Sequence, residues 1–212
     1  MTEQIKKRGH WQVWLMIVML GGVMIAGFLL FPTTQEQRNS LLSSLGTTNH
    51  GEFVLPLVSI EALKLLDAEG KPWQFSEQKH KWRLFIAGGG ECVEQCREML
   101  YLSRQVHISL GKYSRRFERL YLALDSKLSD ETAGYIKQNH PFLKVYRGSS
   151  QELEDLLKAT NAPFTFSAGK QEDRMRAYLV DQNGLVMMSY TLANNGSEMI
   201  EDIEHLMKYS PE

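Results

Sequence analysis

An uncharged stretch near the start of the chain most limits how this sequence can fold. Residues 11–31 contain no Asp, Glu, Lys or Arg and consist mainly of Leu, Ile, Val, Met, Gly and aromatic residues. A helix of this length rises about 1.5 Å per residue and covers the roughly 30 Å hydrocarbon core of a bilayer. Trp11 and Trp14 suit the boundary at the lipid headgroups. The stretch therefore predicts one transmembrane anchor.

The charges on either side of this stretch predict its orientation. Three basic residues occupy positions 6–8, whereas residues 32–55 contain only one, Arg38. Because basic residues are retained in the cytoplasm, we expect residues 1–10 there and everything after the anchor outside. A cleaved signal peptide is the alternative, but no small-x-small cleavage motif and no lipobox cysteine follows the stretch. In a bacterium the protein would be a single-pass inner-membrane protein with a periplasmic domain, where neighbouring cysteines are oxidised.

The rest of the chain divides into a tether and one domain. Residues 32–56 are rich in Thr, Ser, Gln, Asn and Gly, which predicts a tether, and residues 57–212 are long enough for one folded domain. The chain has 24 Lys and Arg residues against 25 Asp and Glu residues, so no basic excess is available for a nucleic-acid backbone. We therefore exclude nucleic acid as a partner. Two cysteines are also too few for a disulfide scaffold or a four-cysteine zinc site.

Hydrophobic periodicity in the domain predicts alternating strands and helices. Apolar residues recur every three or four positions over 93–110, which predicts a helix, and the short, mainly apolar segments at 82–87 and 117–124 predict buried strands. The other predicted elements are a hairpin of 59–66 with 73–75, helices at 129–138, from 149 to about 160 and from 195, a strand at 143–146, and a hairpin of 177–180 with 185–190. This order predicts an α/β thioredoxin-like fold, a mixed central sheet flanked by helices, with an extra N-terminal β-hairpin.

Both cysteines lie in the turn after the first core strand, which reads Gly88-Gly-Gly-Glu-Cys92-Val-Glu-Gln-Cys96. At positions i and i+4 of a helix start, their Cβ atoms lie about 5 to 6 Å apart, so the sulfurs can form a disulfide or hold one soft ion. The helix N-terminus favours thiolate, which a nucleophile and a Cu(I) ligand both require, although Glu91 and Glu94 oppose this. A passive disulfide or a buried cysteine pair is the alternative, but a glycine-rich turn favours a functional pair.

Several motifs occur together with this CxxxC pair. They are Leu122-Ala-Leu-Asp125, Tyr135-Ile-Lys-Gln-Asn-His140-Pro and Tyr178-Leu-Val-Asp181-Gln-Asn-Gly184. With these motifs, residues 59–207 resemble the Sco/SenC family. The resemblance implies a membrane-tethered thioredoxin-fold protein that helps to insert copper into the binuclear copper centre of cytochrome c oxidase, or that acts on the thiols of that centre. The implied partner is the copper-binding subunit of the oxidase, and the implied metal is Cu(I).

The sequence departs from the family pattern at the implied metal site. The family has CPxxCP, whereas Val93 and Arg97 occupy the proline positions here. The third copper ligand of the family is a histidine five residues before the hairpin tyrosine, and Asp173 stands at that position. The resemblance thus implies Cys92 and Cys96 as catalytic residues and metal ligands. A carboxylate at Asp173 is a hard donor that matches Cu(I) poorly, while nearby Met175 offers a soft thioether.

Three functions from different classes remain open. The preferred one is an assembly factor that handles Cu(I) or reduces copper-site thiols through Cys92 and Cys96. The second is a general thiol:disulfide oxidoreductase, which the missing histidine favours but the CxxxC spacing disfavours, as does the lack of proline over 164–177. The third is a non-catalytic, membrane-tethered adaptor, so enzymatic activity stays open. The four histidines of the domain proper are expected at the surface: His80, His107, His140 and His205.

Overall fold

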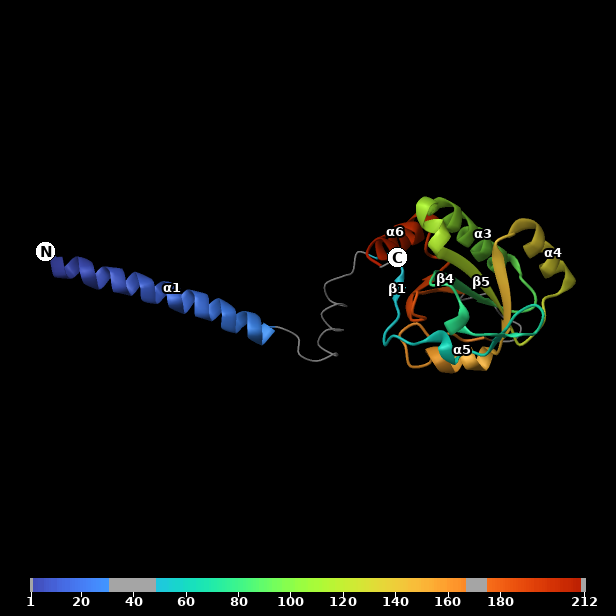
Figure 1. Cartoon of the computed structure of the whole chain (residues 1–212), viewed down its shortest axis with the longest axis horizontal. Coiled ribbons are helices and arrows are strands. Elements are labelled where there is room, and N and C mark those ends of the chain that lie inside the picture. Colours follow the sequence, from blue (N-terminus) through green and yellow to red (C-terminus); the bar gives the residue numbers. More distant parts are fainter. Residues whose placement is uncertain (1, 31–48, 167–174, 211–212) are drawn as a thin grey trace. The chain divides into compact units, whose positions relative to one another are not determined.

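The computed structural model describes residues 2–30, 49–166 and 175–210, in two separate units, 1–48 and 49–212 (Figure 1). The described part of the first unit is a single helix, α1 (Thr2–Leu30). It includes residues 11–30 of the predicted anchor, and residue 31 lies outside the described residues. Within the described part of the chain, no helix combines the length and the apolar character needed to cross a membrane.

The second unit is built on one sheet, which has eight strands among the described residues. Across the sheet the order is β1-β8-β7-β4-β5-β6-β2-β3. The central strands β4, β5 and β6 run parallel, and the other pairs are antiparallel. The bounds are β1 (Glu52–Phe53), β2 (Leu65–Leu66), β3 (Pro72–Trp73), β4 (Trp82–Gly88), β5 (Phe117–Leu124), β6 (Leu143–Gly148), β7 (Arg176–Val180) and β8 (Val186–Thr191). The predicted mixed sheet and the hairpin of β7 with β8 are confirmed. The N-terminal hairpin is shorter than predicted, because only β2 and β3 pair, and residues 60–62 and 75–77 form 3-10 turns instead of strand.

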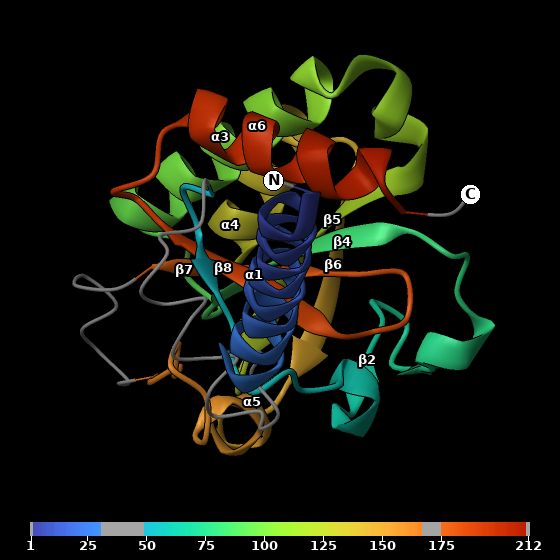
Figure 2. The same ribbon diagram turned by 90° about the vertical axis from the view of Figure 1, so that its left-hand side faces the viewer.

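Helices cover both faces of this sheet, α3 and α6 on one and α5 on the other (Figure 2). The helices are α3 (Glu94–Ser109), α4 (Asp130–Asn139), α5 (Ser150–Leu157) and α6 (Gly196–Lys208), with short 3-10 turns η1 (Ile60–Ala62), η2 (Phe75–Glu77) and η3 (Gly111–Arg116). Side-chain oxygens fix three of the helix starts, because Ser129, Ser149 and Asn195 each accept a hydrogen bond from the backbone N–H three residues later. The predicted helices are therefore found close to their expected starts.

Side chains along β4 and β5 alternate between the two faces of the sheet, which divides the core into two layers. In β4, Leu84 and Ile86 face the layer that contains α3 and α6, whereas Phe85 faces the layer that contains α5. All seven residues of β4 and all eight of β5 are buried. Strands covered on both faces are apolar along most of their length, which is why the sequence revealed them, although β4 contains Arg83 and β5 contains Glu118 and Arg119. The parallel pairing brings the carboxyl ends of β4 and β5 to one edge of the sheet.

The folded unit begins earlier in the chain than the sequence suggested. Residues 49–56 were expected in the tether, but Glu52 pairs with Ser189 in the outermost part of the sheet. Asp202 of α6 is buried and accepts hydrogen bonds from the backbone N–H groups of His50, at 3.0 Å, and Gly51, at 2.8 Å. A two-residue strand in a polar segment has no periodicity of its own, so this boundary could not be recognised from hydrophobic pattern alone.

For one of the four histidines, the predicted surface position is wrong. His80 and His205 are exposed and His107 is half-buried, but His140 is only 2% exposed. Its backbone N–H donates to the Ile136 carbonyl at the end of α4, and this turns the ring inward before β6 begins. Neither ring nitrogen has a hydrogen-bond partner in the described part of the protein. Burial, reinforced by the positive charges of two arginines, Arg119 and Arg104, lowers the pKa of His140 to about 4.

The buried ring predicts a specific acid sensitivity. An unfolded histidine titrates near pH 6.5, so the stability contributed by neutral His140 is present above that pH and is lost as the pH falls toward 4. When the pH is lowered from 7 to 5, the free energy of unfolding of the His140→Leu variant should therefore fall by about 2 kcal/mol less than that of the parent. Urea titration at both pH values measures this difference. The exposed control His80→Leu should keep the pH dependence of the parent. Equal pH dependence in His140→Leu and the parent would contradict this assignment.

Candidate functional site

The two cysteines lie where the central strand β4 passes into α3. Cys92 precedes the helix and Cys96 lies in its first turn, and a disulfide joins them with the Cα atoms 5.2 Å apart. This is one of the two arrangements that their spacing predicted. Both side chains are almost fully buried, Cys92 at 3% and Cys96 at 1% exposure. The sulfurs therefore lie at the edge of the sheet where the parallel strands end, but below the surface of the protein.

The glycines before Cys92 are required by close packing. A Cβ atom at Gly88 would overlap the hydroxyl of Tyr121, which stands on the neighbouring strand β5. At Gly90 an added Cβ would overlap the Lys127 carbonyl oxygen, in the loop after β5. Any other residue at either position would displace backbone or a buried ring. The glycine run thus lets the turn pack directly on β5 and on the loop that follows it.

Tyr121 supplies the main polar contact beneath the turn. Its hydroxyl donates to the Gly89 carbonyl at 2.8 Å and lies 3.6 Å from the Sγ atom of Cys96. Burial raises the pKa of Tyr121 far above its ordinary value, so the phenol stays a neutral O–H group. A second hydrogen bond runs from the Cys92 backbone N–H to the Thr132 hydroxyl at 3.1 Å. These contacts hold the turn against β5 and α4.

Arg97 fixes the other side of the turn, and sequence reasoning did not identify it as functional. Its Nε donates to the Cys92 carbonyl at 3.1 Å, and an Nη atom donates to Glu131 of α4 at 2.6 Å. The guanidinium also lies 4.8 Å from the centre of the Tyr135 ring. A cation beside the pair favours thiolate once the disulfide is reduced. The signal in the sequence was an arginine directly after the CxxxC motif, at a proline position of the Sco/SenC pattern.

The predicted metal ligands are only partly described by the structure. Met175 is buried and belongs to the same apolar cluster as Cys92 and Cys96. Asp173 lies outside the described residues. Across residues 2–30, 49–166 and 175–210, no three His, Cys, Asp or Glu side chains gather closely enough to hold a metal ion. After reduction, the two thiolates are soft donors, which suit Cu(I).

Comparison with known families identifies the domain. A family model for the transmembrane-like, thioredoxin-like, C-terminal domain matches residues 82–210, from the start of β4 to the end of the described chain. The chain belongs to this family. The matched region includes both cysteines and the strand and helix that carry them, so the thioredoxin-like fold predicted from sequence is confirmed. A search of curated proteins found no match.

Solved structures extend the likeness to Sco proteins. Copper-bound ScoI from Arabidopsis thaliana has a TM-score of 0.57 at 15% identity, covering 72% of this chain and all of that one. Apo Sco1 from Thermus thermophilus has a TM-score of 0.56 at 19% identity, covering 75% and 97%. BsSco, a Sco-family oxidase assembly protein with a disulfide switch, has a TM-score of 0.56 at 17% identity, covering 73% and 96%. The resemblance to Sco proteins is thus confirmed at the level of the fold.

The packing of the turn predicts opposite effects for two glycine substitutions. Gly88→Ala places a methyl group against the Tyr121 hydroxyl, so we expect it to destabilise the protein by at least about 2 kcal/mol. Gly134→Ala lies on α4 with no heavy atom within 4 Å of the added Cβ. It should stabilise the protein by about 0.5 to 1 kcal/mol through helix propensity. Urea unfolding of both variants tests the difference, and equal effects would show that the turn tolerates a side chain.

Proposed function

We propose that this protein is a Sco-like assembly factor for cytochrome c oxidase that acts through reversible oxidation of Cys92 and Cys96. The disulfide at the strand-to-helix turn is the observation that carries the proposal. It occurs in a fold shared with copper-bound ScoI and with BsSco, which is described as an oxidase assembly protein with a disulfide switch. The proposed partner is the copper-binding subunit of the oxidase, whose thiols must be reduced before they can bind metal.

The chemistry of the pair follows from its two redox states. The disulfide carries no thiolate, so it must first gain two electrons and two protons from a partner dithiol. In the reduced pair, the α3 N-terminus and Arg97 both favour thiolate. One thiolate then attacks the disulfide of an oxidised copper site and forms a mixed disulfide. The second cysteine resolves it, which releases two reduced thiols on the partner and restores the Cys92–Cys96 disulfide.

Cu(I) is the proposed cargo of the reduced pair. Two thiolates are sufficient for a low-coordinate Cu(I) ion, and Met175 adds a soft thioether in the same apolar cluster. These sulfur donors are soft and match Cu(I), and the imidazole that the Sco/SenC pattern expects for Cu(II) is absent at position 173, where Asp173 stands. The donor set therefore favours the lower oxidation state of copper.

A general thiol:disulfide oxidoreductase is the second candidate. It is favoured by the covalent pairing of the two sulfurs in a thioredoxin-like domain. It would need no copper and no dedicated oxidase partner. Metal binding by the reduced protein separates it from the assembly factor.

Copper titration is the test of the proposed cargo. Reduced full-length protein should take up one Cu(I) per chain from a competing chelator, and both Cys92→Ser and Cys96→Ser should abolish this uptake. The oxidised parent should bind none, because thiolates and not disulfide sulfurs are the ligands. Asp173→His should bring Cu(II) retention and a thiolate-to-copper charge-transfer band.

Complementation tests the proposed role in the cell. In a strain that lacks this protein, lost oxidase activity should return when the parent is expressed and should not return with Cys92→Ser.

Two outcomes would overturn parts of this proposal. If the reduced parent binds no copper, the chaperone role gives way to thiol exchange. If the parent already holds Cu(II) with an intense thiolate band, another residue supplies the third ligand and the weak Cu(II) affinity is refuted.

We further propose that residues 11–31 anchor the protein in the inner membrane, with the domain in the periplasm. The proposal is supported by the uncharged stretch and by the basic residues at positions 6–8. Protease added to spheroplasts should digest the domain and leave an N-terminal epitope tag protected until the membrane is permeabilised. A domain that resists protease in intact spheroplasts, yet is cleaved after permeabilisation, would contradict this topology.

A further inference from the structure

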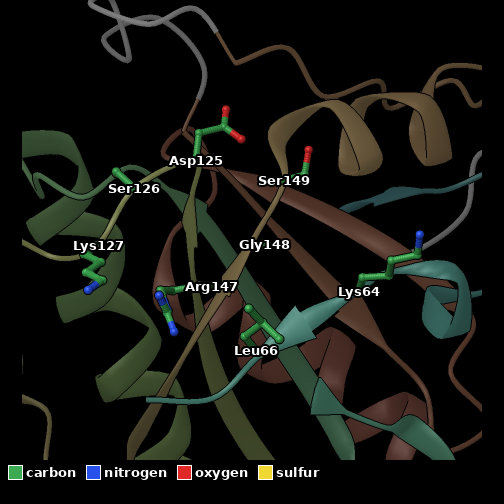
Figure 3. A pocket seen from close by; sticks show the side chains of 8 residues that line it. All are labelled: Lys64, Leu66, Asp125, Ser126, Lys127, Arg147, Gly148 and Ser149. Atoms are coloured by element: carbon green, nitrogen blue, oxygen red, sulfur yellow. The ribbon is translucent and has the colours of Figure 1, made fainter. Parts of the chain in front are cut away.

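Figure 3 shows a basic pocket of about 440 Å³ on the folded unit. It lies at the carboxyl ends of β5 and β6, which run parallel to the strand that leads to Cys92. The loop after β5, the start of α5 and strand β2 supply its walls. The pocket has no role in the thiol chemistry proposed above.

The lining of this basic pocket is strongly cationic. Lys64, Lys127 and Arg147 contribute three positive charges, and Asp125 is the one carboxylate in the lining. Asp125 is already engaged, because it accepts a hydrogen bond from the Ser150 backbone N–H at 2.9 Å. In the described part of the protein, none of the three cations forms a salt bridge. Three cationic side chains against one carboxylate leave the lining with a net positive charge.

The fold also gives Arg147 a fixed place in the pocket. Gly70, in the turn between β2 and β3, has φ +82°, and an added Cβ there would lie only 3.4 Å from an Nη atom of Arg147. The guanidinium thus lies against the backbone of Gly70, in a turn whose Asp67 and Glu69 line a neighbouring pocket that also includes Arg147. Figure 3 shows Arg147 and Lys127 extending toward the same side of the pocket.

The wall of the basic pocket is continuous with the cysteine turn. The Ser129 backbone N–H donates to the Gly90 carbonyl at 2.9 Å, and Gly90 packs against the Lys127 backbone. Cys92 in turn donates to Thr132 at the start of α4. A group held by Lys127 would therefore be positioned relative to the disulfide by a short, hydrogen-bonded stretch of chain.

A second pocket of about 570 Å³ shares Lys127 and Arg147 with the first. Five of its ten lining residues are apolar: Ala68, Leu128, Ala133, Ile136 and Val145. Besides the two shared cations, the charged ones are Lys137 and the carboxylates Asp67 and Glu69. Together the two pockets offer charged and apolar surface side by side. A small inorganic anion would use only the first kind of surface, whereas a polypeptide segment can use both.

We propose that the basic pocket binds an acidic segment of the protein whose cysteines exchange with Cys92 and Cys96. This inference rests on the thiol chemistry proposed above and names the chemistry of its partner. Lysine and arginine recognise carboxylates, and Arg147 can do so through two parallel N–H groups. Complementary charge beside the reactive pair would speed encounter and orient the incoming cysteine.

Fluorescence anisotropy with a cysteine-free probe tests the basic pocket. A labelled peptide of six glutamates should bind the full-length protein at about 20 mM salt and bind at least tenfold more weakly at about 300 mM, because exposed charges are screened. The matching glutamine peptide should not bind. A Lys127→Gln/Arg147→Gln double variant should lose at least tenfold in affinity. Arg147→Lys should lose less than Arg147→Gln, and the exposed control Lys158→Gln should stay within twofold of the parent.

Each contrary result is decisive. Equal binding of the glutamine peptide, or unchanged affinity in the double variant, would overturn the proposal. Displacement of the glutamate peptide by millimolar inorganic phosphate, at matched ionic strength, would show a small-anion site and would also overturn it. Since the probe has no thiol, failure of copper binding or thiol exchange would refute the proposed function and leave this result unaffected.

Discussion

The position of the cysteine turn depends on the hydroxyl of Tyr121. Parallel pairing places Tyr121 of β5 beside Ile86 of β4, and the phenol then reaches beneath the turn that follows β4. There it donates to the Gly89 carbonyl and contacts the sulfur of Cys96. The absence of a side chain at Gly88 makes this approach possible. Strand pairing, the glycine run and the placement of the reactive sulfurs are thus consequences of one packing arrangement.

Sequence reasoning succeeded where the physical signal is local. The buried strands β4 and β5 appear as mainly apolar segments, and Ser129, Ser149 and Asn195 reveal helix starts through their caps. The CxxxC spacing likewise indicated that the sulfurs could meet, as they do. Each of these features is determined by neighbours within a few residues.

What could not be predicted depends on contacts between distant parts of the chain. The strand at 52–53 forms only because β8 is beside it, and the inward turn of His140 depends on the packing of α4 and β6. Arg97 became recognisable as part of the site only when Glu131 and the Cys92 carbonyl were found within its reach. The basic pocket likewise combines residues from three separated segments.

The disulfide closes a very short loop, since its cysteines are only four positions apart in the sequence. Cross-links of this kind restrict the unfolded chain little: the loop-entropy relation gives about 2 kcal/mol, against about 4.7 kcal/mol for a loop of 100 residues. Neither the pairing of β4 with β5 nor the hydrogen bond from Tyr121 to Gly89 involves the sulfurs, so opening the bond removes neither. The domain can therefore keep its fold in both redox states, and a change between them alters the chemistry of the turn while the surrounding surface stays the same.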